Sequence, residues 1–245
     1  MMASRGIRVA GTAASAVVFM MGLSTNVSAA ETPDTLQQQI NHVLASTEGG
    51  AQISRYEIAW NGGEAVMAFP LPGELYAPPS SPAAIKLEAK FAGVPKAETA
   101  EAVAKASAAA DDNSGELPGI PAPEDIPTDE ADPGVTTRAT ADCPTQTIGN
   151  DWYYFYQFKE YAGRRLSWNA KHTDYMYFSA YDFVNRTSSW SNKGGKTIYV
   201  RGRTESGNDA SCNQYSNNGW NEAAHTSSAA LSAKLDNTAD CFWTS

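Results

Sequence analysis

The chain has 245 residues, a net charge of −9 and a pI of about 4.8. The acidity is uneven, because residues 31–142 contain 18 acidic and 6 basic side chains whereas residues 143–245 contain 9 and 10. An acidic excess confined to one segment is typical of a solvated region and not of a binding surface, and neither half has the cluster of Lys and Arg that nucleic-acid binding requires. We therefore exclude a nucleic-acid-binding protein.

The N-terminus has the pattern of a secretory signal peptide. Arg5 and Arg8 form a basic region, an apolar run follows, and residues 27–30 offer small side chains for cleavage. The apolar run holds about 15 residues, fewer than the ~20 that span a bilayer. We expect residues 1–29 to be removed, and the mature protein to be secreted, extracellular and without a membrane segment.

Residues 30–74 are expected to form a small unit of one helix and a β-hairpin. Apolar residues recur at one-face spacing from Leu36 to Leu44, after a Thr-Pro start that suits a helix N-terminus. Apolar and polar residues then alternate on both sides of an Asn-Gly-Gly sequence at 61–63, which predicts a hairpin. A unit of this size buries little apolar area, so it could dock on another part of the protein.

Residues 75–142 are rich in Pro, Ala and acidic side chains. Nine of the chain's 13 prolines fall in this segment, five of them within residues 118–133, and proline disrupts both helices and sheet pairing. We predict a disordered or extended linker, in which the Ala-rich residues 99–110 could form a transient helix. A cleaved propeptide is the alternative interpretation of the front segment.

Residues 143–245 differ in kind from the rest of the chain. They contain five of the six tryptophans, with many Tyr and Phe residues separated by Asn, Ser and Gly. Such a sequence predicts an all-β domain of short antiparallel strands and polar turns, with a core of aromatic side chains. We expect Trp168, Trp190 and Trp243 to pack in that core.

An internal repeat organises this domain. Tyr156 and Tyr161 flank four residues and Gly163 follows, which predicts a strand, a folded corner and a return strand, with glycine where a side chain would not fit. A polar and aromatic segment over residues 181–190 completes the first copy. A weaker second copy occupies residues 197–243.

These segments resemble the two Greek keys of a βγ-crystallin domain. The chain is also similar to secreted actinobacterial proteins of the metalloproteinase-inhibitor type, which share this fold. Those proteins begin the domain with Cys-Pro and end an aromatic strand in Gly-Arg-Arg-Leu, as residues 143–144 and 163–166 do. They commonly carry a further cysteine where this chain has Tyr154, so one family disulfide is impossible here. The resemblance implies an all-β, two-Greek-key sandwich over residues 143–245 and a function in peptidase inhibition.

The resemblance also implies a calcium site, because microbial members of the crystallin family bind calcium through paired signatures of Asn, Asp and hydroxyl residues. The candidate ligands are the side chains of Asn185, Ser188, Asp236 and Asp240 and the main-chain carbonyls of Arg186 and Thr238. Val184 and Cys241 depart from the signature, and the same polar groups could simply hydrogen-bond the turns. We expect structural use of the motif and little calcium binding, and no other cofactor.

Three cysteines, Cys143, Cys212 and Cys241, all lie in the back half. Disulfides persist in an oxidising extracellular space, and a small domain gains stability from one. One bridge and one odd cysteine is the simplest arrangement. Spacing alone leaves the pairing open; we favour Cys212–Cys241 because both residues lie in the second repeat.

The sequence contains no Gly-x-Ser-x-Gly, HExxH, Walker or Rossmann pattern, so we expect a protein that is not an enzyme. The predicted function is that of a secreted, monomeric peptidase inhibitor or inhibitor-derived module with an extracellular protease as partner. The alternative is an antifungal-type binder of cell-wall polysaccharide, with Trp220 as the exposed aromatic side chain and Arg164 and Arg165 as a basic pair. A structural, calcium-stabilised extracellular protein is the third hypothesis.

Overall fold

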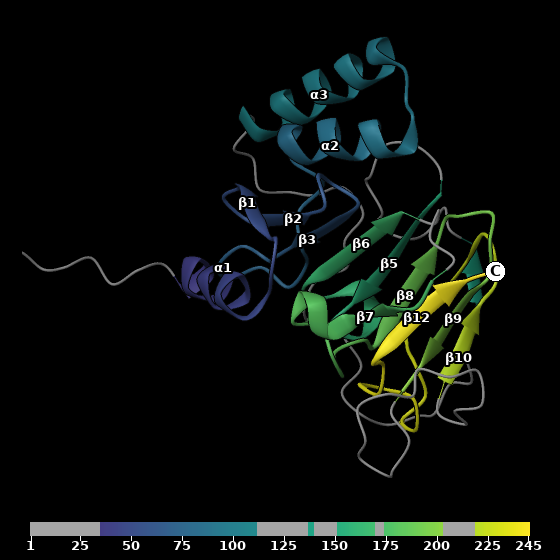
Figure 1. Ribbon diagram of the computed structural model, residues 1–245. Coiled ribbons are helices and arrows are strands. Elements are labelled where there is room, and N and C mark those ends of the chain that lie inside the picture. Colours follow the sequence, from purple (N-terminus) through teal and green to yellow (C-terminus); the bar gives the residue numbers. More distant parts are fainter. Residues whose placement is uncertain (1–34, 112–136, 140–150, 170–173, 203–218) are drawn as a thin grey trace, which may run out of the picture. The chain divides into compact units, whose positions relative to one another are not determined.

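The computed structural model describes residues 35–111, 137–139, 151–169, 174–202 and 219–245, all of which belong to one compact unit (Figure 1). Two antiparallel sheets dominate and helices are few, so the all-β prediction is confirmed. No helix of the described residues is long and apolar enough to cross a membrane. The predicted signal peptide lies outside the described residues and stays a prediction.

The front of the chain forms the expected helix and hairpin. Helix α1 spans Thr35–Ser46 and buries Leu36, Ile40 and Val43, the apolar residues that recur on one face of the sequence. Three short strands follow, β1 (Ala51–Ser54), β2 (Glu57–Trp60) and β3 (Ala65–Ala68). The turn between β2 and β3 requires glycine, because Gly63 has a φ of +104° and a Cβ there would lie 2.4 Å from Leu87 Cβ.

The large sheet has eight strands in the order β1-β2-β3-β6-β5-β8-β11-β4. Figure 1 labels the first six of them. Besides the front strands it contains β4 (Thr137–Ala139), β5 (Trp152–Tyr156), β6 (Arg165–Asn169), β8 (Ser189–Asn192) and β11 (Thr226–Ser228). The small sheet has four strands in the order β10-β9-β12-β7. Its members are β7 (Met176–Tyr177), β9 (Ile198–Arg201), β10 (Gly219–Glu222) and β12 (Cys241–Thr244).

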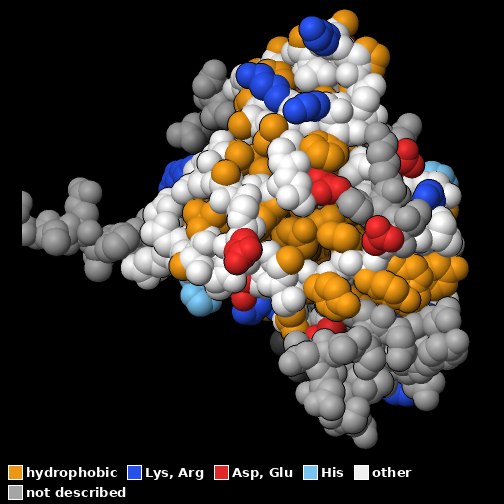
Figure 2. Space-filling model, viewed as in Figure 1, with side chains coloured by type: hydrophobic (Ala, Val, Ile, Leu, Met, Phe, Trp, Pro, Cys, Tyr) orange, Lys and Arg blue, Asp and Glu red, His pale blue; other side chains and the backbone are white. Residues whose placement is uncertain are grey.

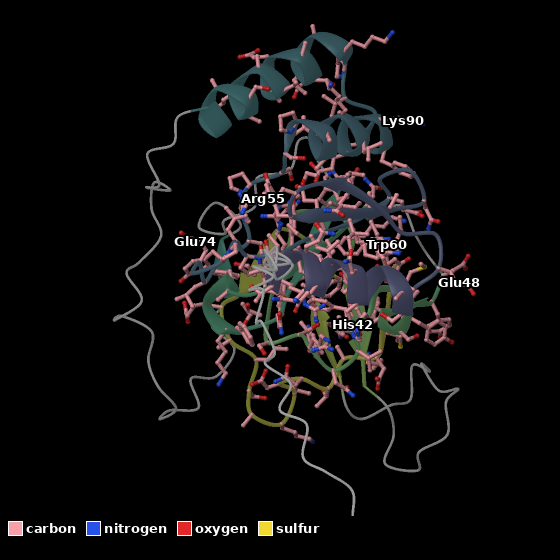
Figure 3. All side chains as sticks on the ribbon, turned by 90° about the vertical axis from the view of Figure 1, so that its left-hand side faces the viewer. His42, Glu48, Arg55, Trp60, Glu74 and Lys90 are labelled. Carbon is pink, nitrogen blue, oxygen red and sulfur yellow. The ribbon has the colours of Figure 1, made fainter. Side chains whose placement is uncertain are left out.

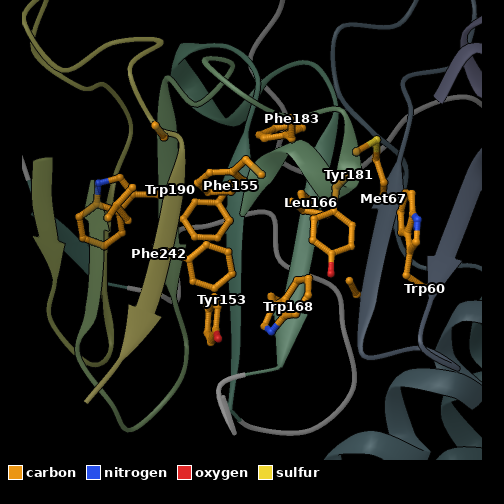
Figure 4. Packing of buried hydrophobic residues seen from close by; sticks show 14 of the residues in the cluster. Trp60, Met67, Tyr153, Phe155, Leu166, Trp168, Tyr181, Phe183, Trp190 and Phe242 are labelled. Carbon is orange, nitrogen blue, oxygen red and sulfur yellow. The ribbon is translucent and has the colours of Figure 1, made fainter. Parts of the chain in front are cut away.

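The front strands are part of the same sheet as the back half. The helix and hairpin therefore dock, as their small size allowed, and are not a separate unit held on a linker. Strand β3 pairs antiparallel with β6, from Ala65 opposite Trp168 to Ala68 opposite Arg165. A single apolar core runs through both halves, and in Figure 4 Trp60 and Met67 lie beside residues of the back half. The Trp60 ring meets Tyr181 edge-to-face at 5.1 Å. The two halves therefore share one core.

The predicted linker contains two helices, α2 (Pro82–Ala92) and α3 (Lys96–Asp111). Helix α3 covers the Ala-rich residues 99–110, where a transient helix was expected, and the prediction of disorder is wrong for α2. The prolines stand at helix starts, where they are tolerated: Pro82 is in the first turn of α2, and Pro95 precedes α3. The Ser81 hydroxyl accepts a hydrogen bond from Ala84 N, and Gly93 closes α2 with a φ of +68°. Residues 112–136 lie outside the described part of the chain.

Buried polar contacts attach α2 to the front strands. The Glu57 carboxylate accepts hydrogen bonds from Ser81 N (3.0 Å) and from the Ser54 hydroxyl (2.7 Å). The Ser80 hydroxyl donates to Glu88 Oε1 (2.9 Å), and all of Ser80, Ser81, Glu57 and Glu88 are buried. Buried carboxylates are tolerated where they are hydrogen-bonded, so these contacts fix the start of α2 on the sheet.

Candidate functional site

The folded corner predicted from aromatic spacing is present after β5. Glu160 and Tyr161 have left-handed φ values of 55° and 64°, and they lie in a short 3₁₀ turn over Lys159–Tyr161. Gly163 also has a positive φ, and a Cβ there would lie 2.7 Å from the Phe158 ring. The Ser189 hydroxyl of β8 donates to Phe158 O (2.6 Å) and accepts from Tyr161 N (3.1 Å). One buried hydroxyl therefore holds the corner closed.

The structure brings the two segments with calcium-type signatures together. Asn185 N donates to Ala239 O (2.9 Å), and Asn237 N donates to Thr187 O (3.0 Å). Asn185 and Asn237 both have left-handed backbones, with φ values of 53° and 55°, a conformation that asparagine tolerates better than most residues. The two loops thus brace each other through reciprocal main-chain hydrogen bonds.

Several candidate calcium ligands already have protein partners. The Ser188 hydroxyl donates to Gln157 O (3.0 Å), and Thr238 Oγ1 donates to Leu235 O (2.8 Å). The Arg186 guanidinium hydrogen-bonds Asp182 O (3.2 Å), while Asp236 Oδ2 lies 3.9 Å from Lys159 Nζ. The main chain of Asp240 accepts a hydrogen bond from Phe178 N (3.0 Å) and donates one to Arg201 O (2.9 Å). The contacts of Arg186 and Thr238 involve their side chains, whereas the predicted ligand atoms of these two residues are the main-chain carbonyls. Structural use of the motif and weak calcium binding both stay predictions.

The ionisable residues of the front half do not converge. In Figure 3, which looks onto the side of the molecule where α1 lies, His42, Glu48 and Glu74 stand apart. Within the described residues, no group of three or more His, Cys, Asp and Glu side chains could hold a metal ion.

Arg164 and Arg165 are buried, so the prediction of an exposed basic pair is wrong. They are 6% and 2% exposed. The Arg164 guanidinium lies 5.7 Å from the ring centres of both Phe69 and Phe183, and its Nη1 is 3.4 Å from Asp182 Oδ2. Burial, and then the nearby Arg186, lower the Arg164 pKa, and Asp182 opposes them. Phe69 belongs to the front half, which explains why the local sequence did not predict this burial.

Trp220 is also buried, which corrects the prediction of an exposed loop tryptophan. It lies in β10 opposite Val200 and points into the core, with 8% of its surface exposed. Its indole N–H donates to Glu222 Oε1 (2.9 Å). Glu222 is fully buried, and desolvation raises its pKa well above the ordinary value, although the Trp220 hydrogen bond acts in the opposite direction. Polar neighbours in sequence misled the prediction, because the strand alternates between the two faces.

Cys241 lies at the start of β12, where it is buried and stands opposite Arg201. Arg201 in turn pairs with Gly219 of β10. The last residue of β9, Arg201, and the first residue of β10, Gly219, are therefore paired in the small sheet. Cys241 lies on the other side of Arg201, in the same row of paired residues. Cys143 and Cys212 lie outside the described residues, so the pairing of Cys212 with Cys241 stays a prediction.

An aromatic row, formed by Tyr175, Tyr199 and Trp243, lies on the outer face of the small sheet. Tyr199 and Trp243 are opposite each other in β9 and β12, with ring centres 5.4 Å apart and planes within 15°. Tyr175, just before β7, lies 4.9 Å from Trp243 and is 45% exposed. Arg201 Cζ lies 5.2 Å from the Trp243 ring centre. Figure 2 shows hydrophobic side chains gathered on the face of the molecule that carries β12.

The aromatic row was missed because Trp243 was expected in the core. The feature of the sequence that could have revealed it is the alternation of faces along a strand: Phe242 and Trp243 are neighbours, so only one of them can point into the core. In β12, Phe242 is fully buried and Trp243 is half-buried.

Comparisons of this chain with protein-family models, with curated proteins and with solved structures found no match.

Proposed function

We propose that the protein is a secreted, non-enzymatic binding module of the peptidase-inhibitor type, built on a two-Greek-key, βγ-crystallin-like sandwich. The strand order supports this fold. In the first repeat β5, β6 and β8 lie in the large sheet and β7 lies in the small one, whereas in the second repeat β9, β10 and β12 lie in the small sheet and β11 in the large one. Such a reciprocal exchange of third strands interlocks the two repeats of a crystallin-type domain.

The observation that carries the inhibitor proposal is the clamped base of the connection between β9 and β10. Arg201 pairs with Gly219, and Arg201 Nη1 donates to Trp220 O (2.9 Å) and to Asn221 Oδ1 (3.1 Å). A Cβ at Gly219 would lie 2.3 Å from Val200 O, so only glycine allows this close approach. A substrate-like inhibitor loop needs fixed ends, because less conformational entropy is then lost on docking.

The predicted bridge between Cys212 and Cys241 would add a second tie. Cys241 stands on the same rung as Arg201, directly beside the strand from which the loop departs. A disulfide closing this loop would restrict it covalently. The bridge therefore fits the inhibitor hypothesis, and its pairing is part of the proposal.

The test is inhibition of a thermolysin-type metallopeptidase and a subtilisin-type serine peptidase by the purified protein. We expect tight, saturable inhibition of at least one enzyme, lost in Gly219→Ala. Gly195→Ala is the matched control, because a Cβ there meets only Asp151 Oδ1 at 4.0 Å. No inhibition by the folded wild-type protein, or equal inhibition by Gly219→Ala, would remove the proposal.

A structural role for the braced loops is the second candidate function. The reciprocal bonds of Asn185 and Asn237 tie the two repeats together without a ligand. A calcium-stabilised extracellular protein would place its ion at these loops, which a calcium titration tests (Discussion).

A further inference from the structure

We propose that the outer face of the small sheet binds polysaccharide, through the apolar C–H faces of a β-linked pyranose chain such as those of cell walls. This site goes beyond the proposed inhibitor function. The two sites share Arg201 and Asn221, and the aromatic row belongs to this site alone. Its centre is the aromatic row, and Asn221 continues the same rung on the side of β10.

The strand register places these side chains in a line across the sheet. Asn221 is opposite Tyr199, and Tyr199 is opposite Trp243. The pairing of Met176 with Phe242 puts position 175 beside Trp243 at the end of that rung. The neighbouring residues Val200 and Phe242 point the other way and are fully buried. The rings therefore share one side of the sheet, and their spacings of 4.9 and 5.4 Å follow the distance between strands.

The corresponding aromatic residues of the large sheet are covered. Trp152, Tyr154 and Tyr156 of β5 form a buried cluster against which Phe91 and Ala92 of α2 pack. The aromatic row has no such cover among the described residues: Tyr175 is 45% exposed, and Tyr199 and Trp243 are half-buried. Contiguous aromatic surface of this kind usually marks a binding site, and Tyr and Trp suit a wet ligand because each joins an apolar ring to a polar tip.

Arg201 acts as a positioning residue for the rings. Its Cζ lies 5.2 Å from the Trp243 ring centre and 5.9 Å from that of Tyr199, within the range of cation–π attraction. Its Nη1 is hydrogen-bonded to Val200 O (2.7 Å), Trp220 O and Asn221 Oδ1. Hydrogen bonds to the sheet thus fix the position of the guanidinium, and its cation–π contacts fix the positions of the two rings.

The size of the face favours a saccharide over a protein. Three strands of four residues and the two-residue β7, about 4.8 Å apart with a rise of ~3.3 Å per residue, offer roughly 220 Å². A stable protein interface needs about 800 Å² from each partner. A chain of a few sugar rings matches the smaller area, and the hydroxyls of the tyrosines and the Asn221 amide can bond its hydroxyl groups.

The experiment measures retention of the purified protein on insoluble chitin, cellulose and peptidoglycan, each as a binding isotherm. We expect saturable binding to at least one of the three, and the pattern among them identifies which β-linked pyranose source is used. Tyr175→Ala and Tyr199→Ala should each weaken binding about tenfold. Phe158→Ala is the matched control, because Phe158 is an aromatic residue 54% exposed outside the small sheet, and it should bind as the wild type does.

Three outcomes would overturn the proposal: no retention of the wild-type protein, wild-type retention of both Tyr variants, or loss of peptidase inhibition in the Tyr variants without loss of retention. The last outcome would make the face a protein-docking surface. Thermal unfolding of each variant checks that it is folded. The two Tyr variants leave Gly219 and its pairing with Arg201 unchanged. Inhibition that survives in them while retention is lost therefore separates this site from the inhibitor loop, and either proposal can fail alone.

Discussion

The two sheets carry similar aromatic residues on their outer faces, but these residues are covered on the large sheet and partly exposed to solvent on the small one. On the large sheet, Trp152, Tyr154 and Tyr156 are almost completely buried beneath the end of α2. On the small sheet, Tyr199 and Trp243 are half-buried and Tyr175 is exposed. The same residue type therefore serves as core on one face and as surface on the other. The front half makes the difference, because it supplies the covering helix and extends only the large sheet.

Removing the Trp60 side chain should produce the largest effect. Trp60 is 2% exposed, comes from the front half and packs edge-to-face on Tyr181 of the back half. Trp60→Ala should reduce the free energy of unfolding by about 3–5 kcal/mol, measured by urea denaturation with both near-UV and far-UV signals. The two signals should shift together. Near-UV and far-UV transitions at different urea concentrations would show that the two halves have separate cores.

A matched pair of variants compares the two faces directly. Tyr154→Ala removes a fully buried ring beneath α2, and we expect a loss of about 3–4 kcal/mol. Tyr199→Ala removes a half-buried ring, and the loss should be about 1 kcal/mol. Equal losses in chemical denaturation would contradict the distinction between a covered and an open face.

The sequence predicts the features whose cause lies within a few neighbouring residues, and it does not predict those that depend on distant segments. The corner at Tyr161 and Gly163 was predictable, because its spacing and its glycine are local requirements of the turn. Trp220 was expected at the surface and is buried, whereas Trp243 was expected in the core and lies on the outer face. The face of each residue depends on its pairing with β9, which lies twenty or more residues away in sequence.

The sequence indicated that the front half could dock, because it is too small to be stable alone, but it did not indicate where. The prolines of the predicted linker indicated disorder, although Pro82 only marks the start of α2. The burial of Arg164 needs Phe69, a residue almost a hundred positions earlier. The sequence predicted that inward-facing residues of β5, such as Tyr153 and Phe155, form an aromatic core. It did not predict that helix α2 covers the outer face of the same strand.

The buried Glu222 between the sheets predicts a pH dependence. Desolvation raises its pKa in the folded protein above the unfolded value of about 4.3. The folded state therefore holds a proton that the unfolded state has released, and the stability from this group is lost as pH rises from about 4.3 through the folded pKa. Glu222→Gln should be more stable than the wild type at pH 7 and should show a weaker fall in unfolding free energy between pH 5 and 7. An unchanged slope would show that Glu222 does not titrate as proposed.

Calcium should have the smallest effect. The loops around Asn185 and Asn237 are already braced by main-chain hydrogen bonds, and the Ser188 hydroxyl is bonded to Gln157 O. We expect a change of less than about 1 °C in the unfolding temperature with millimolar calcium; a bound ion at a hundredfold excess over its Kd would add about 2.7 kcal/mol. A large upward shift that EGTA reverses and Ser188→Ala abolishes would establish a calcium site.

The most direct test of the shared core is to cut the chain between its halves. Proteolysis within residues 112–136, followed by size-exclusion chromatography under native conditions, should yield two fragments that elute together, because β3 remains paired with β6 and α2 remains packed on the cluster around Tyr154. Separation in denaturant should then leave the isolated back half aggregated or unfolded. A back-half fragment that elutes alone as a folded monomer would contradict the account.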